Sequence, residues 1–308
     1  MRREDIKGLQ QVGLQIVNVC DGRCIMCEKR LGKSEKRTHM SVPQIRQLVQ
    51  EIKTLGIKAV TGVCGLAEAH FHPELDSALA AVSEIPWCFG SNCHALSADK
   101  SEIVVRHKPV GVSLSIDAVT DDVLKTMRPT MDLDRVRENA RYFIDHVRSK
   151  PAWPNRNIYL QMVVTKLNAH QVDAFIDEWL PFIEGIPGVG VHIKPCFAWP
   201  RIPAAEIEQF YPSPAVDLEG RKHPQLRVDN FGVAARLRPS CSLFWKFALV
   251  KADGTYLPCC MCGDDLWGVG NVFETSLLEC YNSPRMKELR ALMLAKKYDQ
   301  VPLCKDCK

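Results

Sequence analysis

The sequence predicts an α/β fold in which six β–α repeats are followed by a small cysteine-rich module. Two observations lead to this prediction. Short apolar runs alternate with amphipathic helical patterns from about residue 14 to 195, and cysteines gather at the two ends of the chain. Six such repeats imply a parallel sheet with right-handed crossovers, either doubly wound or curved into an incomplete barrel.

The first predicted helix has the clearest boundaries. Ser41 is its expected N-cap, Pro43 fits its first turn, and Gly56 ends it.

Active sites in such folds gather at the C-terminal ends of the strands. Strands are predicted at 14–19, 58–63, 87–91, 110–117, 157–164 and 188–195, and further helices at 74–83, 97–106, 132–148 and 169–183.

The repeats end where prolines become frequent. Six prolines between 200 and 239 interrupt the pattern, which predicts a linker with little regular structure. We therefore expect a barrel domain at 1–200, a linker at 201–240 and a separate module at 241–308.

The C-terminal module is predicted to contain a hairpin and a helix. Asp253-Gly254 is a strong turn signal between the apolar runs Phe247–Val250 and Thr255–Leu257. Residues 284–297 show a helical pattern. The module is therefore expected to be α+β.

Composition narrows the class of protein. The 308 residues are 46% hydrophobic, with a formal net charge of +4 that is spread along the chain and favours no nucleic-acid partner. No stretch approaches the roughly 18 apolar residues of a membrane span, and the N-terminus leads into no apolar signal segment. We expect a cytoplasmic protein without a membrane partner, whose 14 cysteines are reduced and serve metal ligation.

Cys20, Cys24 and Cys27 follow the first predicted strand in one short loop. Three thiolates at this spacing can ligate three irons of a [4Fe–4S] cube, which leaves the fourth iron open for chemistry. The alternative is a zinc site with a distant fourth ligand, although structural zinc sites close with four ligands and favour C-x2-C pairs.

This C-x3-C-x2-C loop resembles the signature of the radical S-adenosylmethionine (SAM) superfamily. The resemblance implies a partial (βα)6 TIM-like barrel in which the amine and carboxylate of SAM chelate the open iron. One electron then cleaves the sulfonium, and the resulting 5′-deoxyadenosyl radical abstracts a substrate hydrogen. It also implies a flavodoxin- or ferredoxin-type electron donor.

Other positions resemble the family's cofactor contacts. Glu68 matches the carboxylate that holds the SAM amine, although Leu66, Ala67 and Ala69 replace the family's glycines and proline. Met26 takes the place of an aromatic residue that packs against adenine. The other implied SAM contacts are Asn92 after the third strand, Ser113, Ser115 and Asp117 on one face of the fourth, and Arg128, whose planar fork suits a carboxylate.

Four cysteines of the C-terminal module form a second candidate site. The predicted hairpin brings Cys241 and Cys259 together, and the terminal pair Cys304 and Cys307 closes the site. Four thiols also fit zinc. The surrounding sequence resembles the Twitch module, the short form of the SPASM domain, which implies one auxiliary [4Fe–4S] cluster.

Cys260 and Cys262 leave the ligand assignment open. Either thiol can replace Cys259 as a ligand, or donate a hydrogen atom to a substrate radical. Both are therefore also candidate catalytic residues.

The expected reaction is the two-electron oxidation of an alcohol carbon in a sugar- or aminocyclitol-type natural-product intermediate. A cluster with four cysteine ligands has no open iron, so its expected role is to accept the second electron. The cysteine layout resembles the Twitch-type 2-deoxy-scyllo-inosamine dehydrogenase of butirosin biosynthesis. That resemblance concerns the layout of the site and does not fix the substrate.

Three alternatives stay open. A radical epimerase would use a cysteine as hydrogen donor, and a peptide-modifying enzyme would act on a ribosomal peptide. A barrel that begins near residue 14 is expected to leave no room for the usual N-terminal peptide-recognition domain. The third alternative is a metal-binding scaffold without enzymatic activity.

Gln161, His192 and Lys194 are the predicted substrate contacts. His192 and Lys194 share one face of the sixth predicted strand, so both are candidates to bind hydroxyl groups or take the carbinol proton. The alternative is that they are ordinary polar strand residues that meet solvent.

Overall fold

The chain forms two compact units that do not follow sequence order. One contains Met1–Cys20, Gly32–Cys88 and Ala235–Lys308, and the other contains Asp21–Leu31 and Phe89–Ala234. The computed structural model describes residues 8–31, 37–58, 62–63, 66–150, 153, 155–197, 199, 202–211, 213–216, 218, 220–229, 241–260 and 267–305, without the side chains of residues 30, 31, 302 and 303. No helix in these ranges is long and apolar enough to cross a membrane.

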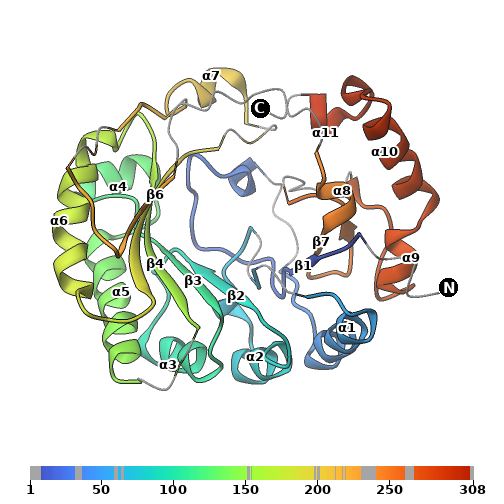
Figure 1. Cartoon of the computed structure of the whole chain (residues 1–308), viewed down its shortest axis with the longest axis horizontal. Coiled ribbons are helices and arrows are strands. Elements are labelled where there is room, and N and C mark those ends of the chain that lie inside the picture. Colours follow the sequence, from blue (N-terminus) through green and yellow to red (C-terminus); the bar gives the residue numbers. More distant parts are fainter. Residues whose placement is uncertain are drawn as a thin grey trace. The chain divides into compact units, whose positions relative to one another are not determined.

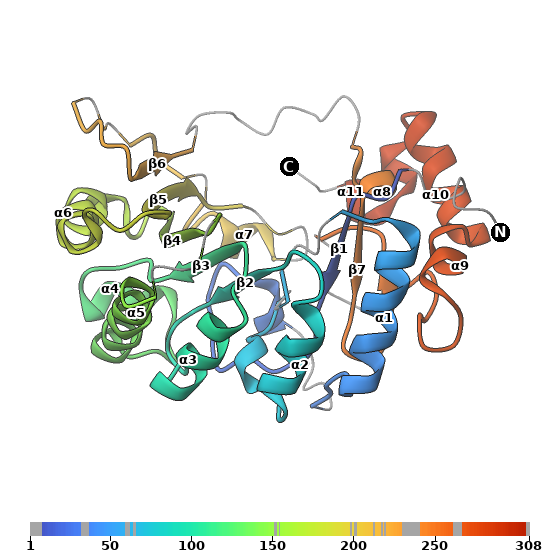
Figure 2. The ribbon, with the colours of Figure 1, turned by 60° about the horizontal axis from the view of Figure 1, so that its bottom comes forward.

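A five-stranded sheet organises the second unit, in the order β2-β3-β4-β5-β6. Neighbouring strands from β3 to β6 run parallel, and helices α3 to α6 lie along the outer side of the sheet (Figures 1 and 2). The strands are β2 (Cys88–Ser91), β3 (Gly111–Ser115), β4 (Asn157–Val164), β5 (Val189–Pro195) and β6 (Leu226–Val228). The helices are α3 (Ala98–Arg106), α4 (Asp121–Met127), α5 (Leu133–Arg148), α6 (Val172–Ile183) and α7 (Ala204–Ile207), with 3-10 turns η2 (Glu28–Leu31) and η4 (Ala169–Gln171).

The other unit joins the two ends of the chain in a three-stranded sheet, β1-β7-β8. β1 pairs in parallel with β7, and β7 pairs antiparallel with β8. The strands are β1 (Gln11–Leu14), β7 (Phe247–Val250) and β8 (Tyr256–Leu257). The helices are α1 (Val42–Leu55), α2 (Leu75–Val82), α8 (Leu243–Lys246), α9 (Leu277–Tyr281), α10 (Pro284–Leu294) and α11 (Pro302–Lys305), with 3-10 turns η3 (Ala69–Phe71) and η6 (Tyr298–Gln300).

Backbone hydrogen bonds place the predicted second strand beside its neighbours. Leu14 N donates to Gly62 O at 3.2 Å, and Val63 N donates to Cys88 O at 3.0 Å. Residues 59–61 lie outside the described ranges. Residues 62 and 63 are thus hydrogen-bonded through their backbone to Leu14 at the end of β1 and to Cys88. The α/β fold class is confirmed, with no closed barrel within the described ranges.

Local signals explain the best-predicted elements. Ser41 forms a capping box with Gln44, and Gly56 ends α1 in the left-handed conformation at φ 70°. Gly254 turns the β7–β8 hairpin at φ 88°, and a Cβ there would meet Asn271 Oδ1 at 2.3 Å.

Some predicted boundaries differ from the structure. The strand predicted at 14–19 is observed at Gln11–Leu14, so the two ranges share only residue 14, and the helix predicted at 284–297 ends at Leu294. Helix α4 was not predicted, and the proline-rich segment contains α7 and β6. All three elements are short, so they carry too few apolar repeats for a periodic signal.

Candidate active site

The cysteine loop, residues 20–27, carries three half-buried thiols. Ile25 N donates to Met127 O at 2.9 Å, which attaches the loop to the end of α4, and Met26 is buried. Burial raises the pKa of Cys27 to about 11, so the metal-free thiol is protonated at neutral pH. Bound iron would displace that proton, because a thiolate is the form that ligates metal.

A group of polar residues, here called the loop clamp, holds the first turn of this loop through Asp21. Asn92 Nδ2 donates to Asp21 Oδ1 at 2.8 Å, and His94 Nδ1 lies 2.8 Å from Asp21 Oδ2. Thr130 Oγ1 donates to Asp21 O at 2.8 Å. Burial raises the pKa of Asp21, but the hydrogen bonds from Asn92 and His94 outweigh it and hold this pKa below its ordinary value.

The loop clamp gives Asn92 a defined position. Its Nδ2 is bound to Asp21, and its Oδ1 accepts from His94 N at 2.9 Å. Its neighbour Cys93 adopts the left-handed conformation at φ 64°, and Asn139 Nδ2 donates to Cys93 O at 2.7 Å. The turn after β2 is thus tied to the cysteine loop, whereas the resemblance implied a cofactor contact for Asn92.

Three predicted residues form a row across the sheet, here called the polar row: Ser115 on β3, Gln161 on β4 and His192 on β5. Ser115 pairs in register with Gln161, and Gln161 with His192, so their side chains share one face of the sheet. Gln161 Nε2 donates to Ser115 Oγ at 3.2 Å. Ser113 lies two residues before Ser115 on the same face and is half-buried.

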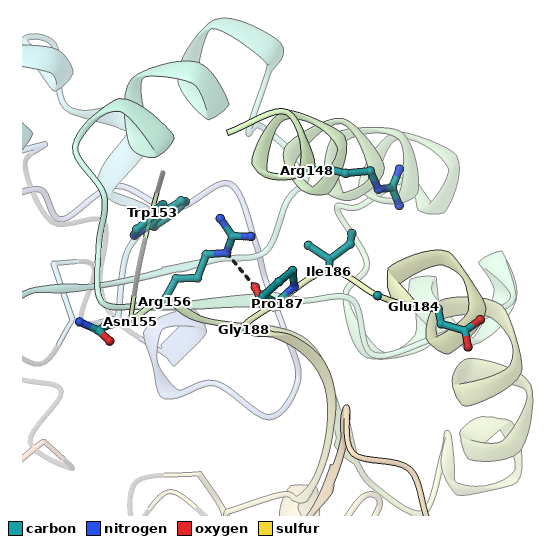
Figure 3. Close-up of a pocket in the computed structure, with 9 residues that line it drawn as sticks. Arg148, Trp153, Asn155, Arg156, Glu184, Ile186, Pro187 and Gly188 are labelled. Atoms are coloured by element: carbon teal, nitrogen blue, oxygen red, sulfur yellow. Dashed lines mark hydrogen bonds between the residues drawn. The ribbon is translucent and has the colours of Figure 1, made fainter. Parts of the chain in front are cut away.

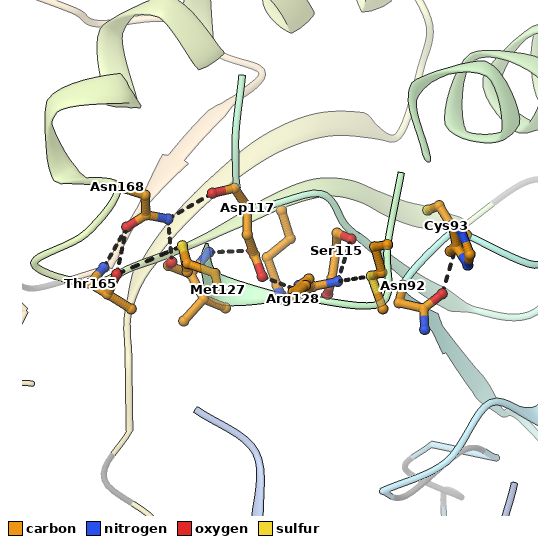
Figure 4. Close-up of polar contacts among 12 residues, drawn as sticks. Asn92, Cys93, Ser115, Asp117, Met127, Arg128, Thr165 and Asn168 are labelled. Carbon is orange, nitrogen blue, oxygen red and sulfur yellow. Dashed lines mark hydrogen bonds and ion pairs between the residues drawn. The ribbon is translucent and has the colours of Figure 1, made fainter. Parts of the chain in front are cut away.

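Asp117 and Arg128 form a buried ion pair just beyond β3 (Figure 4). Asp117 adopts the left-handed conformation at φ 67°, and its Oδ1 accepts from Val163 N at 2.7 Å. Arg128 Nη1 also donates to Ser115 O at 3.1 Å. The family resemblance implied that Asp117 and Arg128 each contact SAM. In the structure their opposite charges pair with each other at the C-terminal end of β3.

His192 and Lys194 both have lowered pKa values. Burial lowers the pKa of His192 and outweighs the opposite effect of Asp229, so its imidazole is neutral at pH 7. Burial also lowers the pKa of Lys194, against the carboxylates of Asp117 and Asp229. A neutral imidazole can accept a proton, and a lysine ammonium can donate hydrogen bonds to a substrate oxygen.

Glu68 lies in the other compact unit, at the start of η3, and is 7% exposed. Its backbone N–H donates to Val19 O at 2.9 Å, and its Oε2 lies 3.3 Å from His70 Nδ1. The structure therefore presents a buried carboxylate on the segment that follows the predicted second strand.

One C-terminal cysteine, Cys259, lies in an apolar cluster. Cys259 is 5% exposed and belongs to a cluster with Phe247, Leu249 and Leu257. Cys241 and Cys304 are half-buried, and Cys260 is exposed. Cys262 and Cys307 lie outside the described residues.

A cavity of about 460 Å³ opens at the N-terminal ends of the strands, where residues 153, 155 and 156 and residues 184–188 lead into β4 and β5 (Figure 3). Its two arginines donate hydrogen bonds to backbone carbonyls: Arg148 Nη2 to Phe182 O at 2.6 Å, and Arg156 Nε to Pro187 O at 2.9 Å. Since active sites of this architecture lie at the carboxyl ends of the strands, we do not assign the reaction to this cavity.

Two family models match the chain. The model described as the radical SAM superfamily matches residues 14–178, and one described as an iron–sulfur cluster-binding domain, SPASM, matches residues 241–308. The chain belongs to the radical SAM superfamily. This membership confirms the predicted cofactors, which are SAM and two iron–sulfur clusters.

Solved radical SAM structures share the fold. SuiB of Streptococcus suis bound to S-adenosylmethionine gives a TM-score of 0.67 at 16% identity, over 92% of this chain and 68% of SuiB. BtrN in complex with AdoMet and 2-DOIA gives 0.56 at 11% identity, over 97% and 93% of the two chains. Native anSMEcpe with bound AdoMet gives 0.59 at 14% identity, over 97% and 89%. No curated protein sequence matches the chain.

The donor sets of this radical SAM enzyme fit the two clusters. Three thiols lie on one short loop, and the described part of the C-terminal module contains five cysteines, Cys241, Cys259, Cys260, Cys280 and Cys304. Within the described ranges, no three His, Cys, Asp or Glu side chains converge on one metal ion. The ligands of a [4Fe–4S] cube do not need to converge on one point, because each cysteine ligates a separate iron.

Sequence reasoning missed several residues of the site. Asp21 and His94 complete the loop clamp, and Asp229 contacts His192. Asp21 lies within the cysteine motif, so its position gave a signal, whereas His94 and Asp229 meet their partners only through the tertiary fold.

Proposed function

We propose that this radical SAM enzyme oxidises an alcohol carbon of a small polar substrate, a sugar or an aminocyclitol in natural-product biosynthesis. The observation that carries the proposal is the polar row, whose hydroxyl, amide and imidazole groups share one face of the sheet. Such groups suit a substrate with several hydroxyl or amino groups. Gln161, His192 and Lys194 are the proposed substrate contacts.

The cofactors would be held by the two cysteine regions. Cys20, Cys24 and Cys27 are the proposed ligands of the first cluster, and Cys241, Cys259, Cys304 and Cys307 those of the auxiliary cluster. When bound, SAM and the clusters supply the 5′-deoxyadenosyl radical and an acceptor for the second electron. Met26, Glu68, Asn92, Ser113, Ser115, Asp117 and Arg128 remain the proposed SAM contacts, and a flavodoxin- or ferredoxin-type protein the proposed reductant.

The contacts of the proposed SAM residues favour an indirect role for Asn92. Its amide binds Asp21, so it would position the cysteine loop and act on SAM through it. Arg128 is paired with Asp117. In this proposal the ion pair either holds the end of β3 in place or opens when the SAM carboxylate competes for the guanidinium.

Related structures support a small substrate as well as a peptide. BtrN was solved with 2-DOIA, whereas SuiB was solved with the precursor peptide SuiA and anSMEcpe with the Kp18Cys peptide. BtrN matches this chain over 93% of its own length, and anSMEcpe bound to the Kp18Cys peptide over 89%. Coverage therefore does not separate the two substrate classes. The polar row favours a small molecule, and the expected electron-accepting role of the auxiliary cluster favours oxidation over epimerisation.

An anaerobic assay with SAM, dithionite and 2-deoxy-scyllo-inosamine or myo-inositol tests the proposal. Oxidation predicts a product that has lost two hydrogen atoms, with deuterium from a labelled carbinol carbon appearing in 5′-deoxyadenosine. One solvent deuterium in a product of unchanged constitution would instead indicate an epimerase that uses a thiol such as Cys260 or Cys262. Turnover of ribosomal peptides with neither polyol consumed would contradict the small-molecule proposal.

A further inference from the structure

Asp229 lies beside His192 at the edge of the sheet formed by β5 and β6. Its backbone N–H donates to Ile193 O at 2.9 Å, which fixes Asp229 against β5. His192 Nε2 lies 3.1 Å from Asp229 Oδ1, an ion-pair distance at which the N–H is not fully aligned for a hydrogen bond. His192 is 8% exposed, so this carboxylate contacts a nearly buried imidazole.

Two more side chains hold the pair in place. Arg227 Nε donates to Asp229 Oδ1 at 3.2 Å, and the guanidinium lies 5.9 Å from the centre of the Tyr159 ring. The Tyr159 ring in turn lies 5.4 Å from the His192 ring. The imidazole is therefore set between an aromatic ring on β4 and a carboxylate beyond β6.

This arrangement selects one nitrogen of His192 as the basic one. The carboxylate favours a proton on the nitrogen that faces it, Nε2, because N–H···O⁻ is attractive and a lone pair facing a carboxylate is not. The other nitrogen, Nδ1, then carries the free lone pair. A histidine whose tautomer is set by a carboxylate is a suitable general base.

We propose that His192 accepts the carbinol proton during alcohol oxidation and that Asp229 is the residue that positions it. This inference rests on the proposed function. Once the C–H hydrogen atom has been abstracted, the O–H bond breaks and its proton bonds to Nδ1 of His192. The auxiliary cluster, which Cys241, Cys259, Cys304 and Cys307 would hold, would supply the acceptor for the remaining electron as the C=O bond forms. The substrate would thus lose two hydrogens and two electrons in total.

The charges that face His192 fix the expected pH dependence. Asp229 raises the pKa of His192, whereas burial, the largest effect, and the cations Arg227 and Lys194 lower it. Removal of the Asp229 charge therefore lowers this pKa further. His192 would stay neutral to a more acidic pH, and the acid limb of the rate profile would move down by about one pH unit or more.

The experiment uses the reconstituted holoenzyme and its Asp229→Asn variant. The pH profile of carbonyl formation from 2-deoxy-scyllo-inosamine is measured, together with a titration of 15N-labelled histidine without substrate. Asp177→Asn is the matched control, since Asp177, which lies on α6, forms a surface ion pair with Arg221. We expect a lower acid limb and a lower His192 pKa for Asp229→Asn, partial recovery with Asp229→Glu, and no change for the control.

A second variant tests the base itself. His192→Gln should lower carbonyl formation by about 100-fold or more and remove the acid limb, whereas the Asp177→Asn control should keep both. If Asp229→Asn forms the carbonyl with an unshifted acid limb, the positioning role of Asp229 is overturned, while the proposed alcohol oxidation stands. Absence of carbonyl from the wild-type enzyme would overturn the proposed function, and the titration would still report whether the pair exists.

Discussion

The two cysteine regions of this radical SAM enzyme are surrounded by different kinds of side chains. The cysteine loop is held by charged and polar groups, because Asp21 binds Asn92, His94 and Thr130. In the C-terminal module, Cys259 packs among Phe247, Leu249 and Leu257. In the proposed function the two sites have different tasks: the loop site would hold a zwitterionic ligand, which suits polar surroundings, and the C-terminal site would accept an electron, which suits an enclosed cluster.

Loss of a cysteine in the loop should have the largest effect. Cys24→Ala removes a ligand from the cluster that already lacks a fourth thiol, so SAM cleavage should fall below detection. The measurement is 5′-deoxyadenosine formed by dithionite-reduced protein, together with iron content, which should drop from about eight to about four atoms per chain. Cleavage of SAM at the wild-type rate would contradict the assignment of the loop.

Loss of a C-terminal cysteine should separate SAM cleavage from formation of the oxidised product. Cys304→Ala is expected to keep some SAM cleavage but stop formation of the oxidised product, because the second electron has no acceptor. Cys280→Ala is the matched control, since this thiol is buried and its Sγ lies 3.3 Å from Thr275 Oγ1. Normal product formation by Cys304→Ala would refute the electron-transfer role.

The Asp117–Arg128 pair should matter for stability as well as for activity. Arg128→Met leaves a buried carboxylate without its cation, so the free energy of unfolding should fall by about 3–5 kcal/mol. Urea unfolding monitored by circular dichroism measures this loss. If Asp117→Asn combined with Arg128→Met is as destabilising as the sum of the single changes, the two residues are not coupled.

The loop clamp should give the smallest effect of the set. Asn92→Ala removes the hydrogen bond to the charged Asp21 and the one accepted from His94 N, so the free energy of unfolding should fall by about 1.5–3 kcal/mol. Because the clamp holds the cysteine loop, the first cluster should also lose iron faster to a chelator, while the auxiliary cluster should not. Equal loss from both clusters would show that the clamp has no local role.

Local signals account for the part of the fold that the sequence predicted well. Helix α1 has a capping box at Ser41 and a left-handed glycine at its end, and the β7–β8 hairpin has Asp253-Gly254. These features depend on residues a few positions apart, so they are visible in the sequence. The cysteine spacing likewise predicted the first cluster without any tertiary information.

Features that depend on distant partners were not predictable. β1 pairs with β7, more than 200 residues away in sequence, although both had been assigned to separate domains. β6 has only three residues, so no sequence pattern indicated it and residues 201–240 were interpreted as a linker. Asp229 follows β6 in that segment, and its contact with His192 was therefore missed. The clamp of Asp21 by Asn92 and His94 also requires the folded sheet.

Cleavage of SAM by the anaerobically reconstituted, reduced protein tests the central claim most directly. The account predicts 5′-deoxyadenosine in amounts that depend on reductant and on Cys20, Cys24 and Cys27, from a protein with about eight irons per chain. Protein that contains zinc in place of iron, or that holds both clusters and leaves SAM intact, would contradict it.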